Sequence, residues 1–412
     1  MDQQDWLRKL VVQEAWGSLL AQNAGDRETA GYGHTLQEIC QQPYTWTDTA
    51  SRVAKVADRL ANLLPDCEWV VITGSGSSQY AGECVHPTLQ PEIGMPVFTL
   101  GGGWLLLEGS RSVPAARPGL LVSLARSGDS PESTGAVEFF LETEPRVRHL
   151  IITCNETGRL ATRFGDDTRV EVLQLDPRTN DRSLVMTSSF TNLAIACRAL
   201  GCLGAMEGYT IGVDRLASAA RNVLLHQTDT LAGVARGAFQ KVVYLGSGCR
   251  YGAAREAALK MLEMNCGRIF TMAETYLGLR HGPMCAIDEN TLVVCFLDSD
   301  PLARAYEEDL IAELDRKELG ARKLIVGEEI PASLLRDDDV ALEIPGLAAL
   351  GDASVPVLDV LVGQLLAFFR CLAGGLRPDL PSQGVISRVV NGFTVHRGEK
   401  RTETCDSSSL AN

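Results

Sequence analysis

Residues 241–283 read KVVYLGSGCRYGAAREAALKMLEMNCGRIFTMAETYLGLRHGP, and this stretch decides the fold class. The apolar run 241–246 has the length of a buried strand, and a Gly-Ser-Gly turn ends it. A helical pattern of small and apolar residues starts at the turn, and a second strand-like run follows at 268–272. Strands that alternate with helices in this way are typical of a parallel α/β fold.

The same arrangement occurs earlier in the chain. GSGSSQYAGE at 74–83 matches GSGCRYGAARE at 246–256, at a separation of 172 residues. Each half has five strand-like runs, predicted at 69–73, 96–100, 119–125, 148–153 and 170–175, and at 241–246, 268–272, 291–297, 322–327 and 339–344. A long helix is expected to close each half, at about 183–206 and 354–374. The repetition predicts duplication of one α/β unit.

Length and pattern together predict four parts of the chain, because 412 residues exceed the usual size of one hydrophobic core. A helical arm comes first, which the polar stretch 24–35 is expected to interrupt. The last residues, 402–412, are small and polar and are expected to fray. The predicted boundaries are an arm at 1–50, two α/β units at 51–215 and 216–385, and a tail at 386–412.

The charge and cysteine content exclude several classes of function. A net charge of −14 argues against nucleic-acid and anionic-membrane partners, although backbone amides could still bind a phosphate. None of the 12 cysteines forms a C-x-x-C pair, which favours buried, reduced thiols of a cytosolic protein over a zinc site. The polar N-terminus and the absence of an apolar run of about 18 residues predict a cytoplasmic protein.

A charged face on the helix after residue 248 suggests catalysis. Glu256, Lys260 and Glu263 are spaced i, i+4 and i+7, so all three project from one side of the helix. His281 follows in a loop bounded by glycine and proline. Carboxylates, an ammonium and an imidazole can move protons around a carbonyl group at neutral pH. The alternative is a salt-bridged surface helix, but the small and apolar neighbours indicate a covered helix whose charges need partners or a polar ligand.

Two serine-rich turns predict an anion site. Ser77 and Ser78 follow the first strand of the first half, and Ser127 and Ser130 follow its third strand, with Arg126 beside them. Loops at the carboxyl ends of neighbouring parallel strands meet in one crevice, so these groups can converge on a phosphate. Taken alone, Ser130 would more simply cap the helix that begins at Pro131. The dinucleotide and P-loop motifs are incomplete, so a phosphosugar fits better.

These residues together resemble the sugar isomerase (SIS) superfamily in a double-domain form, over about 50–396. The specific motifs are ARSGDSPES at 125–133, MTSSFT at 186–191, LRHGP at 279–283 and RVVNG at 388–392. The closest family is that of galactosamine-6-phosphate deaminase/isomerases, also called tagatose-6-phosphate ketose/aldose isomerases, which share the arm motif TLQEICQQP at 35–43. The resemblance implies two SIS domains, each a three-layer αβα sandwich with a five-stranded parallel sheet. It adds four substrate-binding candidates, Ser188, Ser189, Arg388 and Asn391.

The second half also resembles the isomerase part of glucosamine-6-phosphate synthase, and this likeness implies individual roles. Glu263 matches the base that moves a proton between C1 and C2, with Lys260 nearby and Glu256 positioning the site. His281 matches a ring-opening histidine that comes from the neighbouring subunit, which implies a homodimer with shared active sites. Neither a metal nor an organic cofactor is implied. Arg280 replaces a lysine of the synthase, which leaves the anion contacts there open.

The expected reaction converts galactosamine 6-phosphate, or a close analogue, to tagatose 6-phosphate and ammonia. Release of ammonia is the expected direction because the sequence offers no ammonia-donating glutaminase domain. Three alternatives remain open: a simple aldose–ketose isomerase, a glucosamine-6-phosphate deaminase and a non-catalytic sensor of phosphosugars. His396 is either a tail contact with the sugar or a surface residue.

Overall fold

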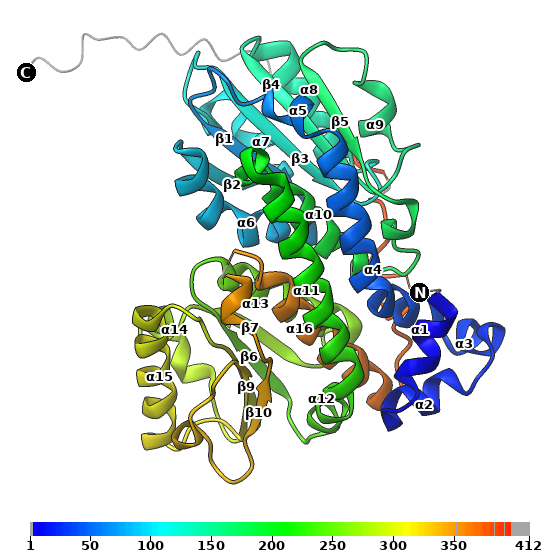
Figure 1. Ribbon diagram of the computed structural model, residues 1–412, viewed down its shortest axis with the longest axis vertical. Helices are drawn as coiled ribbons and strands as arrows, with labels where there is room; N and C mark the ends of the chain where they lie inside the picture. The colour runs from blue at the N-terminus through cyan, green and yellow to red at the C-terminus, as the bar shows by residue number, and fades with distance from the viewer. Residues whose placement is uncertain (1–2, 352, 383, 391, 397–412) are drawn as a thin grey trace, which may run out of the picture.

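The computed structural model describes residues 3–351, 353–382, 384–390 and 392–396 (Figure 1). Asn391 and the tail segment 402–412 lie outside these residues. The first half holds β1 (Val70–Gly74), β2 (Val97–Gly101), β3 (Gly119–Ala125), β4 (Val147–Thr153) and β5 (Val170–Gln174). The second holds β6 (Lys241–Leu245), β7 (Phe270–Glu274), β8 (Thr291–Phe296), β9 (Arg322–Gly327) and β10 (Val340–Glu343).

Both sheets are parallel and have the same strand order. The first runs β2-β1-β3-β4-β5 and the second β10-β9-β8-β6-β7, which is the same order in the numbering of each half. Equivalent residues also keep equivalent register, since Leu121 pairs with His149 as Val293 pairs with Lys323. The predicted pair of five-stranded α/β units is therefore confirmed, and the shared topology supports duplication.

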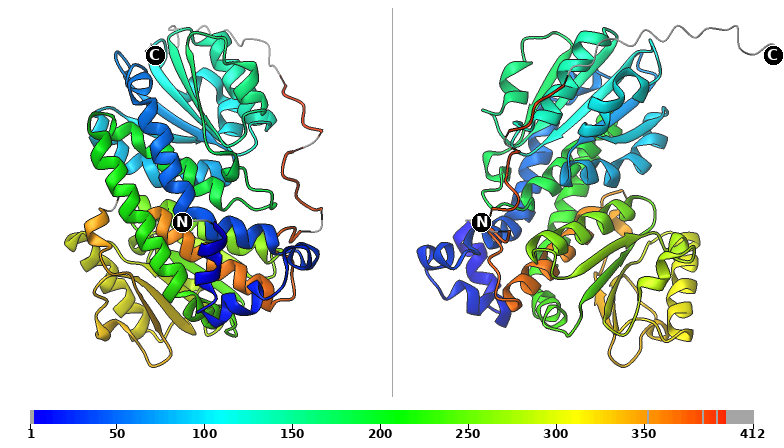
Figure 2. Two further views of the ribbon diagram at one scale, coloured as in Figure 1. Left: turned by 45° about the vertical axis from the view of Figure 1, so that its right-hand side comes forward. Right: turned by 180° about the vertical axis from the view of Figure 1, so that it is seen from behind.

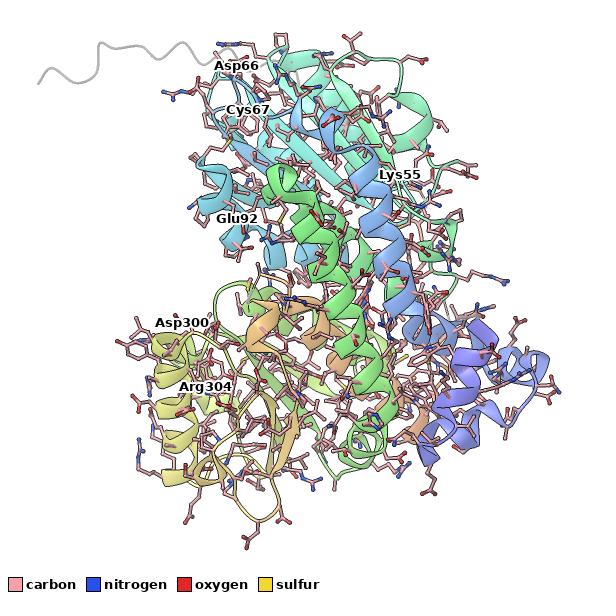
Figure 3. All side chains as sticks on the ribbon, in the orientation of Figure 1. Lys55, Asp66, Cys67, Glu92, Asp300 and Arg304 are labelled. Carbon is pink, nitrogen blue, oxygen red and sulfur yellow. The ribbon has the colours of Figure 1, made fainter. Side chains whose placement is uncertain are left out.

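Helices cover both faces of each sheet. The first half carries α6 (Ser77–Ile93), α7 (Gly102–Glu108), α8 (Pro131–Thr143), α9 (Arg159–Arg163) and α10 (Ser188–Arg198). The second carries α11 (Met206–His226), α12 (Thr228–Ala235), α13 (Cys249–Met264), α14 (Tyr276–Leu279), α15 (Pro301–Arg316) and α16 (Pro356–Ala373). Asp300 caps α15, because its carboxylate accepts hydrogen bonds from the amides of Leu302 and Ala303 at 3.0 and 2.9 Å (Figure 3).

The arm contains α1 (Gln3–Leu10), α2 (Glu14–Leu20), α3 (Ala24–Ala30), α4 (Gly33–Lys55) and α5 (Ala57–Ala61). The prediction that 24–35 interrupts the arm was wrong in part, because this polar stretch forms α3. The Asn23 side chain caps α3 by accepting the amide of Asp26 at 3.0 Å, and Gly31 ends the helix at φ +79°. The longest arm helix, α4, then packs along α10 and α11.

The long helix predicted at 183–206 was also wrong in extent. Residues 183–187 form a loop, α10 covers only Ser188–Arg198, and α11 starts at Met206 after an 84° bend. The start is delayed because the Asp181 carboxylate accepts the amides of Thr187 and Ser189, both at 2.8 Å, at the N-terminal end of α10. The other closing helix, predicted at 354–374, is confirmed as α16. The predicted boundaries at 50/51 and 215/216 fall inside α4 and α11, and the division remains a prediction.

The two halves meet through α6 and α13, whose sequences begin at the two Gly-Ser-Gly turns. A Cβ on Gly252 would lie 2.6 Å from the backbone nitrogen of Cys84, so these helices need glycine at their contact. Glu83 and Arg255, also 172 residues apart, form an ion pair of 2.5 Å across the same contact. The mainly apolar α16 packs against α13, and 83% of its residues are buried. It is the one helix of the described residues that is long and apolar enough to span a membrane.

Candidate active site

The turn after β1 presents hydroxyls at the start of α6. Gly76 has φ 56° and ψ −125°, values that favour glycine, and it directly precedes Ser77. The equivalent Gly248 has φ 52° and ψ −125°, so the two turns share one backbone shape. Ser77 and Ser78 are buried at the first turn of α6, where the positive end of the helix dipole favours an anion.

A cavity of about 260 Å³ lies between the two predicted serine turns. Its walls include Ser77 and Ser78 from the first turn and Ser127 and Ser130 from the second. Glu263 enters the same cavity from α13 of the other half. After α16 the chain runs back to the first half as an extended segment (Figure 2), and this return places residues 386–390 on the cavity wall. The structure thus brings both turns and one predicted catalytic carboxylate together.

Arg126 supplies positive charge to this cavity. Its side chain is buried, and NH1 donates to the carbonyl oxygens of Ser183 and Leu184 at 3.2 and 2.9 Å. No carboxylate of the described residues lies within ion-pair distance of the guanidinium. Burial lowers the pKa of Arg126, and nearby Asp181 partly opposes that shift. A buried cation without a direct counter-ion is a good binding group for an anionic ligand.

The serine hydroxyls of the second turn are only partly used by the protein. Ser127 Oγ accepts the amide of Asp129 at 3.2 Å, and Ser130 Oγ donates to Glu132 at 2.6 Å. Ser130 is the N-cap residue of α8 and Pro131 starts the helix, as the sequence predicts, but the Ser130 side chain makes no capping hydrogen bond. The Ser127 hydroxyl keeps its hydrogen for a phosphate oxygen, whereas the Ser130 hydroxyl must turn away from Glu132 to donate to one.

Lys260 connects the serine turn to the carboxylates of α13. Its Nζ donates to Ser77 Oγ at 3.1 Å and to Glu263 Oε2 at 2.5 Å, and it lies 3.4 Å from Glu256 Oε1. Lys260 and Glu256 are fully buried, whereas the Glu263 side chain is 23% exposed. The predicted alternative of a solvated, salt-bridged face is therefore wrong. The triplet is covered by protein and faces the anion site.

Burial sets the protonation of the two inner groups. It raises the pKa of Glu256 to about 8, although the Lys260 ammonium lowers it in part. The raised pKa favours the neutral acid, and Glu256 does not line the cavity, so Glu256 is less suited than Glu263 to act as the base. Burial alone would lower the pKa of Lys260, but Glu256 and Glu263 outweigh it, so the pKa is raised and the ammonium stays charged. Glu263 is the carboxylate of the three that reaches the cavity.

His281 does not reach the cavity of its own chain. It is exposed in the loop after α14, where its amide donates to the carbonyl of Gly278 at 2.9 Å. The preceding Arg280 pairs with Glu313 at 2.7 Å and also lies away from the cavity wall. Within one chain, the structure therefore separates His281 from the other three predicted catalytic groups.

The four residues added by the family resemblance are placed differently from one another. Ser188 and Ser189 are fully buried behind the cavity, where Ser189 Oγ donates to Asp181 at 2.5 Å. Arg388 lines the cavity, and its guanidinium contacts Asn180. Asn391 is not among the described residues. His396 is exposed and is not part of the described cavity wall.

Sequence reasoning missed the loop that forms one wall of the cavity. Leu184 and Met186 line it, and the buried carboxylates of Glu38 and Asp181 hold the loop. Glu38 lies in the arm motif 35–43, which was the available signal.

The prediction that all cysteines are buried needs correction, because Cys266 and Cys285 are exposed. Their positions after α13 and in the loop after α14 explain this.

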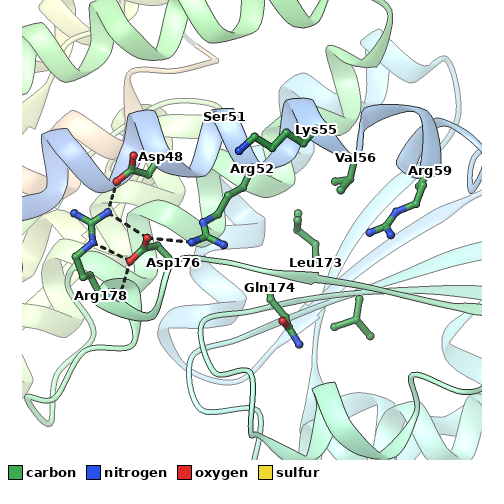
Figure 4. A pocket seen from close by; sticks show the side chains of 11 residues that line it. Asp48, Ser51, Arg52, Lys55, Val56, Arg59, Leu173, Gln174, Asp176 and Arg178 are labelled. Carbon is green, nitrogen blue, oxygen red and sulfur yellow. Dashed lines mark hydrogen bonds and ion pairs between the residues drawn. The ribbon is translucent and has the colours of Figure 1, made fainter.

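A second cavity, of about 500 Å³, lies between α4 and the edge strand β5 (Figure 4). It has basic walls, but Arg52 and Arg178 bind Asp176 at 3.1 and 2.8 Å, and Arg178 also contacts Asp48. These cations already have partners, so this cavity is the weaker anion site. Across the described residues, no group of three His, Cys, Asp or Glu side chains is placed to hold a metal ion.

Comparison with known proteins agrees with this site. A Streptomyces coelicolor protein that bears the name D-galactosamine-6-phosphate deaminase AgaS is 37% identical, over 88% of this chain and 95% of its own. The Escherichia coli D-galactosamine-6-phosphate deaminase AgaS is 32% identical over the same shares. The chain belongs to the AgaS family.

A solved structure of this family has the same fold. The tagatose-6-phosphate ketose/aldose isomerase from Clostridium novyi NT superposes with a TM-score of 0.85 at 30% identity, covering 92% of this chain and 99% of its own. The SIS architecture expected from the sequence is thereby confirmed. No general protein-family model matches the chain.

Proposed function

We propose that this AgaS-family protein releases ammonia from galactosamine 6-phosphate, or a close aminosugar phosphate, and forms tagatose 6-phosphate. The observation that carries the proposal is the contact of Lys260 Nζ with both Ser77 Oγ and Glu263. It joins an anion-binding turn of one half to a proton-transfer carboxylate of the other. The names of the relatives support the same substrate class.

The proposed chemistry begins with the phosphate ester. Ser77, Ser78, Ser127, Ser130 and Arg126 bind it at the carboxyl edge of the first sheet. Glu263 removes the proton from C2 of the open-chain aminoaldose and returns it at C1. O1 gains a proton and the amine nitrogen loses one in the same conversion, which gives the 2-imino compound. Addition of water followed by loss of ammonia then gives the ketose phosphate.

Lys260 and Glu256 support the proton transfer. The Lys260 ammonium stabilises the negative charge that develops on O1 when the enolamine forms. The raised pKa of Glu256 favours the neutral acid, which limits the negative charge beside Glu263, and Glu256 positions Lys260 at 3.4 Å. No step of this sequence needs electrons from a cofactor, since the hydrogen that leaves C2 returns at C1.

We propose a homodimer in which His281 of the second subunit opens the sugar ring. The exposed position of His281, away from its own cavity, supports this arrangement. So do exposed aromatic residues on the edge strands β2 and β7, namely Phe98 at 45% and Phe270 at 52% exposure. The absence of paired thiols among the described cysteines supports a cytoplasmic location, which we propose as well.

Shared sites are tested by mixing two inactive variants. A His281→Ala and Glu263→Gln mixture forms hybrid dimers in which one site has both groups, so about a quarter of wild-type activity should return after subunit exchange. Each variant alone stays inactive on cyclic substrate. A mixture that stays inactive, although sedimentation detects hybrids, contradicts shared sites.

Ammonia release from galactosamine 6-phosphate tests the reaction itself, with glucosamine 6-phosphate as the second substrate. Ammonia should form together with a ketose phosphate in equal amounts. Isomerisation of galactose 6-phosphate without ammonia from either amine would favour the simple isomerase that the Clostridium structure's name suggests. Binding of all these compounds without turnover would favour a phosphosugar sensor.

A further inference from the structure

The loop 180–187, here called the wall loop, joins β5 to α10 and forms one side of the anion cavity through Leu184 and Met186. It has little regular secondary structure, so other elements must hold it in place. Most of its anchors come from the arm helix α4, which contributes no residue to the cavity wall described above. The arm motif 35–43 thus has a structural task that the proposed chemistry does not use.

Glu38 of α4 is the central anchor. Its Oε1 accepts the backbone amides of Arg182 and Ser183 at 2.5 and 3.1 Å, and its Oε2 accepts the Ser183 hydroxyl. Glu38 is only 5% exposed. A buried acceptor with three donors fixes both the position and the orientation of the loop main chain.

Further contacts hold the loop on both sides of Glu38. Before the loop, Arg52 of α4 binds Asp176 at 3.1 Å, and Gln41 Nε2 donates to the carbonyl of Arg178 at 2.8 Å (Figure 4 shows the Arg52–Asp176 pair). At its end, Asp181 accepts the amide of Thr187 at 2.8 Å. The whole segment is therefore fastened along α4.

The wall loop in turn places Arg126. The carbonyl oxygens of Ser183 and Leu184 accept hydrogen bonds from Arg126 NH1, at 3.2 and 2.9 Å. A continuous path therefore runs from the Glu38 carboxyl through Ser183 to the guanidinium that faces the anion cavity. Loss of the Glu38–Ser183 contact frees the carbonyl groups of Ser183 and Leu184, which hold the Arg126 guanidinium.

We propose that Glu38 is a positioning residue of the phosphate site, which sets the place of Arg126 through the wall loop and so determines affinity for the phosphate group. The inference rests on the proposed function for the identity of the substrate. The binding test with inorganic phosphate does not depend on that function. Burial raises the pKa of Glu38 to about 8, with Asp181 as a second contributor. Glutamine is a close replacement, because its oxygen can accept both backbone amides as Oε1 does, and its NH2 group can donate to the Ser183 hydroxyl instead of accepting from it.

Three variants of the full chain test this role at pH 7: Glu38→Ala, Glu38→Gln and the matched control Gln37→Ala, an exposed residue on the same helix. Calorimetric titration with inorganic phosphate gives Kd, and ammonia release from galactosamine 6-phosphate gives KM and kcat. Glu38→Ala should raise both Kd and KM about ten- to hundredfold while kcat stays within about threefold. Glu38→Gln and Gln37→Ala should stay close to wild type.

The inference is overturned if Glu38→Ala keeps wild-type Kd and KM, if kcat alone falls, or if Glu38→Gln is as impaired as Glu38→Ala. If Glu38→Ala does not fold, Ser183→Ala takes its place, since it removes the hydroxyl that donates to Glu38 and to the carbonyl of Val185 and keeps the Ser183 amide contact with Glu38. It should raise Kd by about threefold, and an unchanged Kd counts against the role. A wild-type protein that binds phosphate but releases no ammonia defeats the proposed reaction and leaves the Kd test of Glu38 intact.

Discussion

The carboxyl edges of the two sheets share one backbone and differ in their side chains. After β1, Ser77 and Ser78 start α6 and line the cavity. After β6, the equivalent residues are Cys249 and Arg250. Arg250 is fully buried, and its Nε and NH2 donate to the two carboxylate oxygens of Asp359, both at 2.7 Å. The carboxyl edge of the first sheet is open to an anion. At the carboxyl edge of the second sheet, the buried Arg250 already binds the carboxylate of Asp359.

The turns that follow β3 and β8, the third strands of the two halves, also differ in how their polar side chains are used. Asp300 precedes Pro301 and caps α15, while Ser130 precedes Pro131 and its side chain makes no capping hydrogen bond. The first half thus keeps polar groups available for a ligand, and the second half satisfies them internally. The second half contributes instead the far end of α13, from which Glu263 reaches the first edge. Duplication therefore gave two similar crevices, and only one is arranged as a binding site.

The largest effect is expected for Glu263→Gln, which tests whether the second half supplies the base to the binding site of the first half. The change removes the proposed base from α13 and should lower kcat by about 10²–10⁴ while inorganic phosphate still binds. Steady-state ammonia release measures the effect, and Glu289→Gln, the same change at an exposed position, is the control. Near-normal turnover would contradict the role of the second half in the first site.

The ion pair at the carboxyl edge of the second sheet can be disrupted by Arg250→Ala. The change removes the cation of a fully buried ion pair and keeps the Asp359 charge, so the free energy of unfolding should fall by about 3–5 kcal/mol. Denaturant unfolding measures the loss. The double variant Arg250→Met, Asp359→Leu should recover much of it, because it removes both charges. Equal losses in the single and double variants would mean that packing, and not the ion pair, holds this edge.

Strands β4 and β9 offer a comparison at His149 and Lys323, which are register-equivalent and both fully buried. Lys323 pairs with Asp339 at 2.6 Å, whereas no hydrogen-bond partner of the described residues reaches either His149 nitrogen. Burial lowers the pKa of His149 from 6.5 to about 4, with Arg169 as a second cause. The unfolded chain therefore binds the proton more tightly, and stability is lost as pH falls through 6.5 towards 4.

Replacement of this histidine isolates the effect. His149→Leu should reduce the loss of unfolding free energy between pH 7 and pH 5 by about 2 kcal/mol relative to wild type. Urea unfolding at both pH values measures it. The other titrating groups are common to both proteins, so identical pH dependence in the two would show that His149 is not the acid-sensitive group.

The smallest effect is expected at the serine turns, through Ser127→Ala and its equivalent Ser299→Ala. Both serines are half-buried and follow equivalent strands, but only Ser127 lines the cavity. Loss of one hydroxyl from an anion site should raise KM about tenfold in Ser127→Ala and leave Ser299→Ala unchanged. Equal changes in the two variants would remove the functional difference between the two edges.

The fold could be predicted from the sequence because its signals are local. Apolar runs, Gly-Ser-Gly turns and the 172-residue repeat identify the strands and their parallel arrangement. The errors occurred where a hydrogen bond from a single side chain, three to eight residues away, sets where a helix begins. The Asp181 carboxylate delays α10, and the Asn23 cap with Gly31 turns a polar stretch into α3. Neither contact has a periodic pattern that sequence analysis can detect.

The candidate site was predictable only in part. Serine turns and the α13 triplet are visible because their residue types are unusual for their positions. The wall loop was missed, because Glu38 and Ser183 are 145 residues apart and neither resembles a catalytic group. His281 was visible as an imidazole that follows the triplet closely in the sequence, and its ring-opening role, which the family resemblance implies, remains a prediction.

The sequence by itself determined the two α/β units, the serine-rich turns and the family, since each depends on residues close together in the chain. Only the tertiary structure decided that α13 faces the first sheet's crevice, that Lys260 meets Ser77, and that Arg250 closes the other crevice. These outcomes depend on how α6 and α13 cross at Gly252. Packing between helices that are distant in sequence depends on the complementary shapes of their surfaces, which a local sequence pattern does not reveal.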